Sequence, residues 1–564
     1  MTETLAPSAA SSARLNIAHH LPRQADERPH QRALVVARGR GRDGRTAYAQ
    51  LTFAQLDALT DRTAHALRST GVEPGDRVLI LVRPGFELIA SIYAVFKIGA
   101  VAVFIDPGMG LGPLARCVER IAPRWFIGVS RAHLALTLFG RRALRTVRGR
   151  FLVGGGPGLG AIDLDALAAA CPPTPFPLAP TRADDTAAVL FTSGSTGPAK
   201  GVVYEHGMFD AQVRQLRAVY GIEPGEVDLP GLPIFALFSV ALGATTVFPD
   251  MDPTRPAALD PARWVEFVQD HGVTYSFGSP AIWRRVVRHC QARGLQLPSL
   301  RRVLMAGAPV PPWLHEALLA DVLAPGADTH TPYGATEALP VASITGRDLA
   351  DSFARTRRGE GICVGQPLPE VEVRIIAVDD GPLASFDDAR LLPPGERGEV
   401  VVHGPTVTKA YCELPEATAT AKLRDGKGRV WHRMGDVGCL DEDGRLWFFG
   451  RKAHRVVTGS ETLYPVAVEA IFDEHPRVFR SALIGLGDRP AQRPAVVVQP
   501  EEGAFPVSRA ARAAFCEELR ALGARFPHTA EIERFFFHRA FPVDLRHNAK
   551  IRRGELAAWA ARQG

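Results

Sequence analysis

Apolar residues recur along this chain with two alternating patterns. Residues 53–69 have the spacing of a helix with one buried face, and residues 77–82, 274–277 and 302–305 are short apolar runs typical of buried strands. Such alternation favours an α/β fold (mixed α and β) with mixed sheets, and ligands in such folds usually lie at the ends of the strands.

The longest apolar stretch, residues 88–105, is the best candidate for a transmembrane segment. It contains Lys97 and Gly99 and ends at Asp106-Pro107. That composition predicts a buried helix followed by a strand, and no transmembrane segment.

The pattern changes near Gly450-Arg451-Lys452, where we place a hinge. We expect a large N-terminal domain, residues 1–450, and a small C-terminal α+β domain, residues 451–564, which is within the usual size range. Residues 1–14 are rich in Ser and Ala without an apolar core, so they predict a loose tail and not a secretory signal.

Composition favours a large soluble enzyme. A chain of 564 residues that is 46% hydrophobic can bury more than one core. The formal net charge is only +6 and the basic residues are dispersed, so a nucleic-acid partner is not expected. The seven cysteines lie far apart without a Cys-x-x-Cys pair, which indicates neither a zinc site nor a disulfide framework and favours a reducing, cytoplasmic location.

Lysine is rare, at seven of the 66 basic residues. Where it persists, a compact ammonium is favoured that a planar guanidinium cannot imitate. Lys200 and Lys550 are two of the seven. The other five, which we expect to include surface residues, are Lys97, Lys409, Lys422, Lys427 and Lys452.

Residues 190–201 carry the strongest chemical signal. Their sequence, Leu-Phe-Thr-Ser-Gly-Ser-Thr-Gly-Pro-Ala-Lys-Gly, overlaps an apolar run at 187–191 that predicts a strand. Hydroxyl side chains alternate with glycines that let backbone N–H groups turn toward an anion, and a lysine adds a mobile positive charge. The spacing is not Gly-x-x-x-x-Gly-Lys-Ser/Thr, so the P-loop NTPase interpretation fails. The predicted phosphate-binding residues are Thr192, Ser193, Gly194, Ser195, Thr196, Gly197 and Lys200.

Two other glycine clusters are interpreted as loops. Residues 39–44 spell Gly-x-Gly-x-x-Gly, but that motif must follow a strand and open a helix. Residues 34–37 and 47–53 are both strand-like, so we expect a hairpin tip there, and residues 154–160 are also a loop. No Gly-x-Ser-x-Gly occurs, which argues against a serine hydrolase.

The 190–201 loop resembles the signature of the acyl-adenylating superfamily, which includes acyl-CoA synthetases, luciferases and peptide-synthetase adenylation domains. Residues 331–337, Thr-Pro-Tyr-Gly-Ala-Thr-Glu, resemble its adenine and metal segment. The resemblance implies that Tyr333 stacks on the purine, Thr336 meets the α-phosphate and Glu337 binds Mg²⁺. The other nucleotide contacts that it implies here are Gly334 and, in a loop after a strand, Gly307, Ala308 and Pro309.

Two later segments match the same superfamily in the expected order. Residues 434–438 resemble the ribose segment, which implies that Asp436 accepts both ribose hydroxyls and that Arg451 lies near the ribose and the phosphate. Residues 548–552, Asn-Ala-Lys-Ile-Arg, resemble the catalytic segment of a mobile C-terminal lid. Lys550 would there neutralise charge as a carboxylate attacks the α-phosphate.

These parts imply a reaction with ATP and Mg²⁺ as cofactors. A carboxylate attacks the α-phosphate of Mg-ATP, which gives an acyl-adenylate and pyrophosphate. Catalysis is then mainly positioning and charge neutralisation. The implied catalytic residues are Thr192, Lys200, Glu337 and Lys550.

Three positions depart from the acyl-CoA ligases of the superfamily. Ala236 stands where a histidine is common, Ala453 where an aspartate or lysine is usual, and Ser460 where a glycine lines the pantetheine path. These differences weaken the interpretation as a CoA ligase.

The same chain closely resembles a narrower group, the β-lactone synthetases of bacterial long-chain olefin biosynthesis. The resemblance implies adenylation of a 2-alkyl-3-hydroxy fatty acid, whose own 3-hydroxyl then closes a β-lactone and releases AMP. It also implies work beside a condensing enzyme, a reductase and a lactone decarboxylase. The matching segments are residues 227–230, 235–238, 249–256, 308–312 and 541–550.

For the acyl chain we expect a pocket formed by Phe235, Phe238, Phe277 and their neighbours. His206 either faces the acyl site or packs in the core. Two alternative functions stay open: a long-chain fatty acyl-CoA synthetase or fatty acyl-AMP ligase, and a nucleotide-binding scaffold without catalysis. The scaffold is disfavoured because the charged residues of the motifs are all present.

Overall fold

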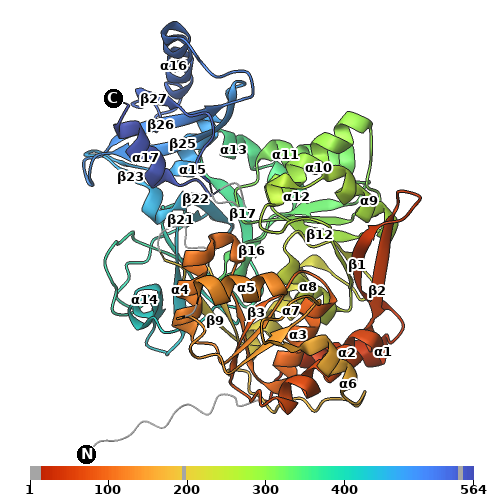
Figure 1. The fold of residues 1–564 in the computed structure, drawn as a ribbon. Coiled ribbons are helices and arrows are strands. Elements are labelled where there is room, and N and C mark those ends of the chain that lie inside the picture. The colour runs from red at the N-terminus through yellow and green to blue at the C-terminus, as the bar shows by residue number, and fades with distance from the viewer. Residues whose placement is uncertain (1–13, 141, 193–197, 544–549, 564) are drawn as a thin grey trace, which may run out of the picture.

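The computed structural model of this protein describes residues 14–140, 142–192, 198–543 and 550–563 (Figure 1). Helices and strands alternate along the chain, and the predicted mixed α/β class is confirmed. Within these described residues, the strands form two seven-stranded sheets, one eight-stranded sheet and two smaller sheets.

The first seven-stranded sheet contains the strands on either side of the predicted phosphate loop. All its neighbouring strands are parallel except the last pair, β8 and β9, which is antiparallel. The strand predicted at 187–191 is therefore confirmed as β8. In spatial order the strands are β7 (Ile162–Asp163), β6 (Gly149–Leu152), β5 (Trp125–Gly128), β3 (Arg77–Leu81), β4 (Val101–Phe104), β8 (Thr186–Phe191) and β9 (Gly201–Glu205).

The second seven-stranded sheet is parallel apart from one hairpin at its edge. That hairpin joins β1 to β2 around residues 41–45, so the Gly-x-Gly-x-x-Gly sequence is a hairpin tip, as predicted. Because β12, β13 and β14 are parallel neighbours, the residues that follow each of them lie at one edge of the sheet. In spatial order the strands are β14 (Asp328–His330), β13 (Arg302–Met305), β12 (Tyr275–Gly278), β10 (Val227–Asp228), β11 (Thr245–Phe248), β1 (Arg32–Arg40) and β2 (Thr46–Thr52).

The eight-stranded sheet is antiparallel and carries most of the later motifs. Its strands β21 and β22 pair Asp436 directly with Arg451. The path is β15 (Tyr333–Ala335), β16 (Ala338–Ser343), β17 (Ile362–Pro367), β22 (Leu446–Arg451), β21 (Val430–Leu440), β19 (Gly398–His403) and β18 (Glu372–Ile376), and β20 (Lys422–Arg424) pairs with β21.

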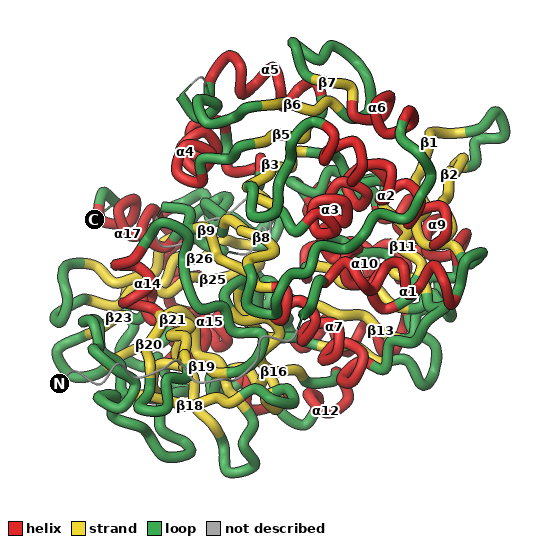
Figure 2. The backbone as a smooth tube through the Cα atoms, turned by 90° about the horizontal axis from the view of Figure 1, so that it is seen from below, coloured by secondary structure: helices red, strands yellow, loops and turns green. Residues whose placement is uncertain are grey.

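Helices pack between and around these sheets. Helix α2 has the predicted bounds, 53–69, and residues 88–105 form α3 followed by β4, also as predicted. Nearly every residue of α3 is buried, and Figure 2 shows this helix between strands of the two seven-stranded sheets. The helices of this part are α1 (His20–Glu27), α2 (Phe53–Ser69), α3 (Phe86–Ile98), α4 (Leu111–Ile121), α5 (Ser130–Phe139), α6 (Leu164–Ala170), α7 (His206–Tyr220), α8 (Ala236–Leu242), α9 (Pro261–His271), α10 (Pro280–Arg293), α11 (Pro312–Ala317), α12 (Gly346–Ala350), α13 (Phe353–Arg357) and α14 (Pro415–Ala421).

Residues after β22 build a smaller unit, drawn in blue at the top of Figure 1. It has a hydrophobic core of its own, with Phe515 and Leu519 from a helix packed on Val496 and Val498 from the sheet. The domain boundary at residue 450 stays a prediction. The elements are β23 (Val456–Val457), β24 (Thr462–Leu463), α15 (Pro465–Phe472), β25 (Val478–Leu486), β26 (Arg493–Pro500), α16 (Arg509–Gly523), β27 (Arg534–Phe537) and α17 (Arg553–Ala561).

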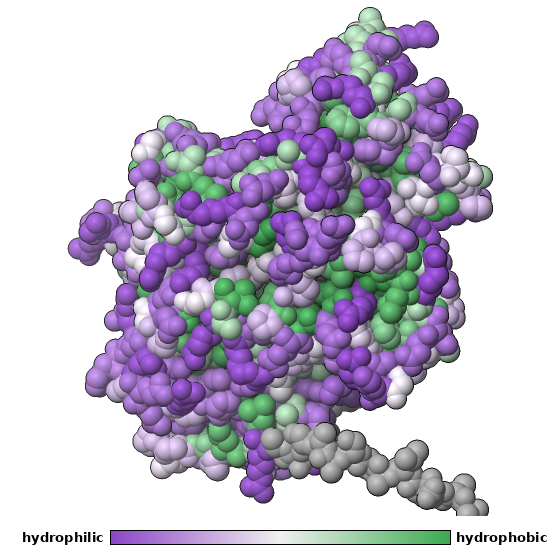
Figure 3. Space-filling model, turned by 180° about the vertical axis from the view of Figure 1, so that it is seen from behind, coloured by the Kyte–Doolittle hydropathy of each residue, from purple (hydrophilic) through white to green (hydrophobic). Residues whose placement is uncertain are grey.

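The surface and the chain start add little to the functional interpretation. Figure 3 shows a mainly hydrophilic face, with hydrophobic residues visible between the polar ones across its middle. None of the described helices is long and apolar enough to cross a membrane. Of the predicted tail, residues 1–13 lie outside the described residues, and Arg14 forms an isolated β-bridge with Arg182.

Candidate functional site

The described ends of the predicted phosphate loop are held together. The Thr192 backbone N–H donates to the Lys200 carbonyl at 3.0 Å, and the Lys200 N–H lies 3.5 Å from Thr192 Oγ1. The Lys200 ammonium lies 4.8 Å from the centre of the Tyr411 ring, within the range of a cation–π contact. The loop's other predicted contacts, Ser193, Gly194, Ser195, Thr196 and Gly197, lie outside the described residues.

Glu337 lies at a tight turn between β15 and β16. Ala335 pairs with Ala338, which leaves Thr336 and Glu337 as the two residues of the turn. A Cβ atom at Gly334 would lie 2.6 Å from the Ala338 carbonyl oxygen, so this close approach requires glycine. The turn thus presents the predicted phosphate and metal residues side by side.

Tyr411 and Thr408 hold Glu337 from a different segment of the chain. The Tyr411 hydroxyl donates to Glu337 Oε1 at 2.8 Å. The Glu337 carbonyl accepts from the Thr408 N–H at 2.9 Å and from its hydroxyl at 3.0 Å. One carboxylate oxygen is therefore oriented by the protein, and the backbone beneath it is fixed.

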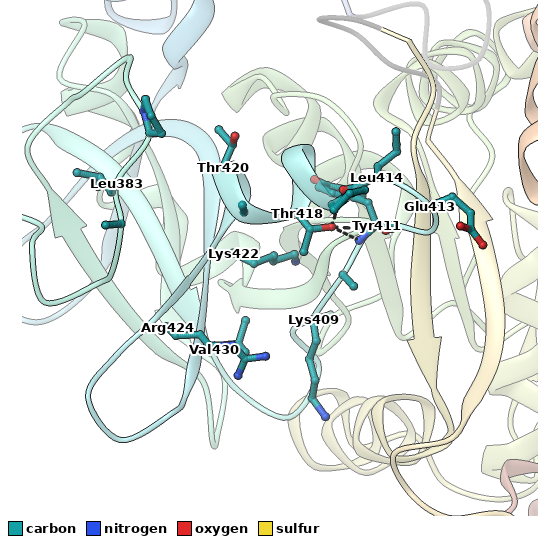
Figure 4. Close-up of a pocket in the computed structure, with 15 residues that line it drawn as sticks. Leu383, Lys409, Tyr411, Glu413, Leu414, Thr418, Thr420, Lys422, Arg424 and Val430 are labelled. Atoms are coloured by element: carbon teal, nitrogen blue, oxygen red, sulfur yellow. Dashed lines mark hydrogen bonds between the residues drawn. The ribbon is translucent and has the colours of Figure 1, made fainter. Parts of the chain in front are cut away.

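Lys422 is buried on β20 and lies next to Thr408 and Tyr411. Its ammonium donates to Thr408 Oγ1 at 2.9 Å and lies 5.8 Å from the centre of the Tyr411 ring. Burial lowers the pKa of Lys422 to about 7, while the Glu337 carboxylate acts in the opposite direction. Figure 4 shows Lys422 extending toward the Tyr411 segment. Both residues line a hollow of about 670 Å³.

Sequence reasoning missed both Tyr411 and Lys422 as site residues. The five lysines other than Lys200 and Lys550 do include surface residues, namely Lys409 and Lys427, but Lys422 is buried. The scarcity of lysine was the signal that could have identified it. No such sequence signal exists for Tyr411, because its partner Glu337 is 74 residues away in sequence.

Asp436, Arg451 and Tyr333 meet in a second group. The Tyr333 hydroxyl donates to Asp436 Oδ2 at 2.7 Å, and Arg451 Nη1 lies 3.2 Å from Asp436 Oδ1. Burial raises the pKa of Asp436, and the neighbouring guanidinium opposes that rise. Sequence reasoning thus named three residues that the structure brings together, although Tyr333 and Asp436 are 103 positions apart.

Gly307, Ala308 and Pro309 follow β13 at the same sheet edge from which the chain leaves β14 toward Tyr333. Gly307 has a φ of 89°, in the left-handed region that favours glycine. The register of the sheet therefore places this loop and the segment that leads to Tyr333 at neighbouring strand ends, and their role in purine binding stays a prediction.

Basic side chains from several segments act on one part of the site. His432 is buried on β21, and its pKa is lowered well below its usual range, first by burial and then by Lys422, Arg451 and Lys200. Three cations from three separate segments therefore act on one point of the site. Such a cluster suits a ligand with several negative charges, such as a nucleotide polyphosphate.

A cavity of about 70 Å³ lies between α7, α8 and the second seven-stranded sheet. Phe235, Phe238 and Phe277 line it, with ring centres 4.5 Å apart for Phe235 and Phe277, so the residues expected for the acyl pocket do come together. Pro332 and Leu339 also line it, and these residues flank the turn that carries Glu337. The cavity therefore borders the predicted nucleotide site.

His206 packs in the core and does not line that cavity. Its Nδ1 accepts from the Ile17 N–H at 3.2 Å, and its ring lies beside Phe96. Burial lowers its pKa to about 4, which keeps the imidazole neutral at physiological pH. Of the two interpretations, packing is the one that the structure supports.

Lys550 lies directly before Ile551, which forms an isolated bridge with Val543. Residues 544–549 of the matching segment lie outside the described residues. At the predicted hinge, the Lys452 ammonium donates to Glu399 Oε2 at 2.9 Å. The catalytic role of Lys550 stays a prediction.

Comparisons with known proteins indicate the family of the chain. Residues 21–412 match the AMP-binding enzyme family. The chain is 47% identical over 562 residues to an olefin beta-lactone synthetase of Xanthomonas campestris pv. campestris, covering 97% of this chain and 98% of that protein. It is 46% identical over 555 residues to an olefin beta-lactone synthetase of Stenotrophomonas maltophilia, with the same coverage.

The fold is also similar to that of a solved structure. An amide bond synthetase from Marinactinospora thermotolerans superposes with a TM-score of 0.78 at 26% identity, covering 96% of this chain and 99% of the other. The match spans both the large part of the chain and the smaller C-terminal unit.

Proposed function

This chain belongs to the AMP-binding enzyme family, and we propose that it uses ATP to activate a long-chain 2-alkyl-3-hydroxy fatty acid and then closes a β-lactone. The observation that carries the proposal is the 47% identity with an olefin beta-lactone synthetase over nearly the whole of both chains. The apolar side chains that gather beside the Glu337 turn, among them Phe235, Phe238 and Phe277, support it, because an acyl chain joined to AMP needs apolar neighbours.

The first step forms the acyl-adenylate. A carboxylate oxygen of the fatty acid attacks the α-phosphorus of ATP, and the bond from that phosphorus to the pyrophosphate oxygen breaks. The cations Lys200 and Arg451 would stabilise the charge of the phosphates, and Asp436 would accept the ribose hydroxyls. The remaining proposed nucleotide contacts are Thr192, Ser193, Gly194, Ser195, Thr196, Gly197, Gly307, Ala308, Pro309, Tyr333, Gly334 and Thr336.

Glu337 fits a Mg²⁺ ion by its chemistry. A carboxylate oxygen is a preferred ligand of this hard cation, which also takes phosphate oxygens. Tyr411 engages Oε1 and so orients the carboxylate, as a partner beyond the ligands often does at metal sites. When bound, Mg²⁺ would neutralise charge on the phosphates of ATP.

Lys550 completes the proposed machinery. We infer that residues 451–564 act as a lid on the domain of residues 1–450, and that lid movement brings this ammonium to the reacting oxygens. Its positive charge would stabilise the negative charge that builds up as the carboxylate attacks.

The second step needs no further substrate. The 3-hydroxyl oxygen attacks the acyl carbonyl carbon, the bond to AMP breaks, and the hydroxyl proton leaves to a base. Because the nucleophile belongs to the same molecule, its effective concentration is high once the chain is folded in the pocket. Exclusion of water from the apolar cavity would protect the reactive anhydride from hydrolysis.

The setting of the enzyme is part of the same proposal. We infer a cytoplasmic location, and neighbours in the pathway that condense acyl chains, reduce the product and decarboxylate the lactone. All seven cysteines lie among the described residues as free thiols, which supports a reducing compartment.

The test is to incubate the protein with Mg-ATP and a 2-alkyl-3-hydroxy long-chain acid, with and without CoA, and to identify the products by NMR and mass spectrometry. A β-lactone and AMP formed without CoA is the expected result. A product formed only as the acyl-CoA thioester would contradict the proposal in favour of a fatty acyl-CoA synthetase. Acyl-adenylate that accumulates without ring closure would favour a fatty acyl-AMP ligase.

A further inference from the structure

Most of the large apolar side chains that remain exposed lie in one stretch of the chain. Among the described residues, nine large apolar side chains are exposed, and five of them fall within residues 134–162. Leu138 is 61% exposed and Phe139 66% exposed, so both protrude from the surface. Single exposed apolar residues are common, whereas a cluster of them is a feature of interaction sites. The five are Leu134, Leu138, Phe139, Leu159 and Ile162.

Helix α5 brings three of these side chains together. Leu134 and Leu138 are four residues apart, so they lie on the same face of the helix, and Phe139 follows in the last turn. The opposite face is buried through His133 and Leu136. Figure 2 shows α5 at the outer edge of the molecule, at the top of that view, beside β6 and β7. The helix is thus anchored by one face and presents the other to solvent.

Arg150 connects this helix to a further exposed apolar residue. Its guanidinium donates to Thr137 Oγ1 at 3.2 Å and to the Leu159 carbonyl at 2.8 Å. Leu159 therefore lies beside α5, although it is 20 residues beyond the end of the helix in sequence. We call this region the α5 surface and define its apolar part by Leu134, Leu138, Phe139 and Leu159.

The same stretch of the chain is strongly positive. Residues 120–162 contain eight arginines, no lysine and neither Asp nor Glu. Their charge of +8 exceeds the formal net charge of the whole chain, +6, so the other residues together are slightly negative. Basic residues are dispersed over the rest of the chain, and here they are concentrated without any acidic neighbours in sequence. Such a concentration attracts an anionic partner.

Four of these arginines have exposed side chains at the two ends of α5. The first lies in the opening turn of the helix, and the other three lie between α5 and β6. That connection stays close to the helix, because the Leu144 N–H donates to the Gly140 carbonyl at 3.1 Å. Within the part of the chain that the structure describes, none of the four forms an ion pair, so their charge is available to a partner. They are Arg131, Arg142, Arg145 and Arg148.

An anionic lipid surface fits this combination of residues. Protruding side chains such as Leu138 and Phe139 can enter the boundary between headgroups and acyl chains, while arginines contact the negative headgroups. A second copy of this chain would bring two positive surfaces together, which is electrostatically unfavourable. A nucleic acid would neutralise the charge but would gain nothing from the exposed apolar side chains.

We propose that the α5 surface docks this protein onto an anionic phospholipid bilayer. Leu138 and Phe139 enter the interface, and the exposed arginines at the ends of α5 lie on the headgroups. Contact of this kind is peripheral and reversible, and added salt weakens it. The proposal uses neither the nucleotide site nor the acyl pocket, so it is independent of the proposed function.

Cosedimentation of the full-length protein with lipid vesicles tests the proposal. One set of vesicles contains phosphatidylcholine alone, and the other contains equal amounts of phosphatidylcholine and phosphatidylglycerol. We expect at least about tenfold tighter binding to the anionic vesicles, because each arginine near such a surface contributes about a fivefold gain in affinity. Raising NaCl from about 0.1 M to about 1 M should remove most of this preference.

Two variants separate the apolar part of the surface from the charged part. The double variant Leu138→Ser, Phe139→Ser removes the inserted side chains and is expected to weaken binding to anionic vesicles about tenfold. The triple variant Arg142→Gln, Arg145→Gln, Arg148→Gln is expected to abolish the preference for anionic over neutral vesicles. Thermal unfolding like that of wild type would show that each variant has folded.

The double variant Val507→Ser, Arg509→Gln is the matched control. It also replaces one exposed apolar residue and one exposed arginine, but these lie at the start of α16 in the smaller unit, far from α5 in Figure 1. This variant is expected to bind both kinds of vesicle as wild type does.

The outcomes distinguish this proposal from the proposed function. Equal binding of wild-type protein to both kinds of vesicle, or binding to neither, would overturn the α5 surface as a lipid-docking site. So would α5 variants that bind anionic vesicles as tightly as wild type, or protein that binds duplex DNA and leaves the vesicles free. In each of these cases β-lactone formation would leave the proposed function intact. Vesicle binding that the α5 variants lose, in protein that activates no acid, would overturn the proposed function alone.

Discussion

Replacing Asp228 by asparagine is expected to make the stability of this protein less dependent on pH. The buried carboxyl has a pKa of about 7 in the folded protein, compared with 3.8 for an ordinary aspartate. The folded state therefore holds the proton more tightly than the unfolded chain. The resulting stabilisation is fully present below pH 3.8 and is lost as the pH rises through about 7.

The size of the effect follows from these two values. Each tenfold change in proton affinity corresponds to about 1.4 kcal/mol, so the full change is about 4 kcal/mol, of which about 2–3 kcal/mol falls between pH 5 and pH 8. Asparagine has nearly the same shape and carries no charge. Relative to wild type, Asp228→Asn should therefore gain about 2–3 kcal/mol of unfolding free energy on going from pH 5 to pH 8.

Urea denaturation at pH 5 and pH 8, without ATP or fatty acid, measures this difference. The comparison between variant and wild type cancels the other groups that titrate in this range. Asp443→Asn is the control, because the Asp443 side chain is 71% exposed. Its replacement should change the unfolding free energy by the same amount at pH 5 and at pH 8. Parallel pH dependence in wild type and Asp228→Asn would refute the reasoning.

Three further predictions concern the nucleotide site. Asp436→Ala removes the acceptor of the Tyr333 hydroxyl bond and the proposed ribose ligand, so KM for ATP should rise about 10–100-fold in the pyrophosphate assay; an unchanged KM would contradict the ribose role. Tyr411→Phe frees Glu337 Oε1 and should raise the Mg²⁺ concentration for half-maximal activity about tenfold; a Mg²⁺ titration identical to wild type would count against the orienting bond. Lys550→Ala should abolish adenylation while calorimetry still detects ATP binding, and retained turnover would disprove its assigned role.

Much of the fold could be predicted because its signals are local. Residues 53–69 form a helix with the predicted bounds. Apolar residues three or four positions apart lie on one face of a helix, so the spacing can be recognised within a few residues. The hairpin at residues 39–44 followed from the strand-like runs on either side. Tyr333, Asp436 and Arg451, which we predict to bind the nucleotide, were named from motifs, and the antiparallel register of β21 and β22 brings two of them face to face.

What the motifs did not contain was missed. Tyr411 is an ordinary tyrosine in sequence, and only the fold places its hydroxyl on Glu337. Lys422 was not singled out among the five other lysines, and only the fold shows that it is buried on β20. His206 had two open interpretations, and its contacts with Ile17 and Phe96 favour packing.

The sequence by itself determined many of the elements and the class of fold, and it predicts the chemistry of the phosphate loop, because apolar spacing, glycine placement and hydroxyl content act over a few neighbouring residues. Only the tertiary structure decided which distant side chains share an environment. Asp228 and Tyr275 are partners because two parallel strands align them, and Ser239 on the helix above hydrogen-bonds to Asp228. The hydrogen bonds and the pKa of a buried side chain depend on all the residues packed around it, and those residues come from segments far apart in the chain.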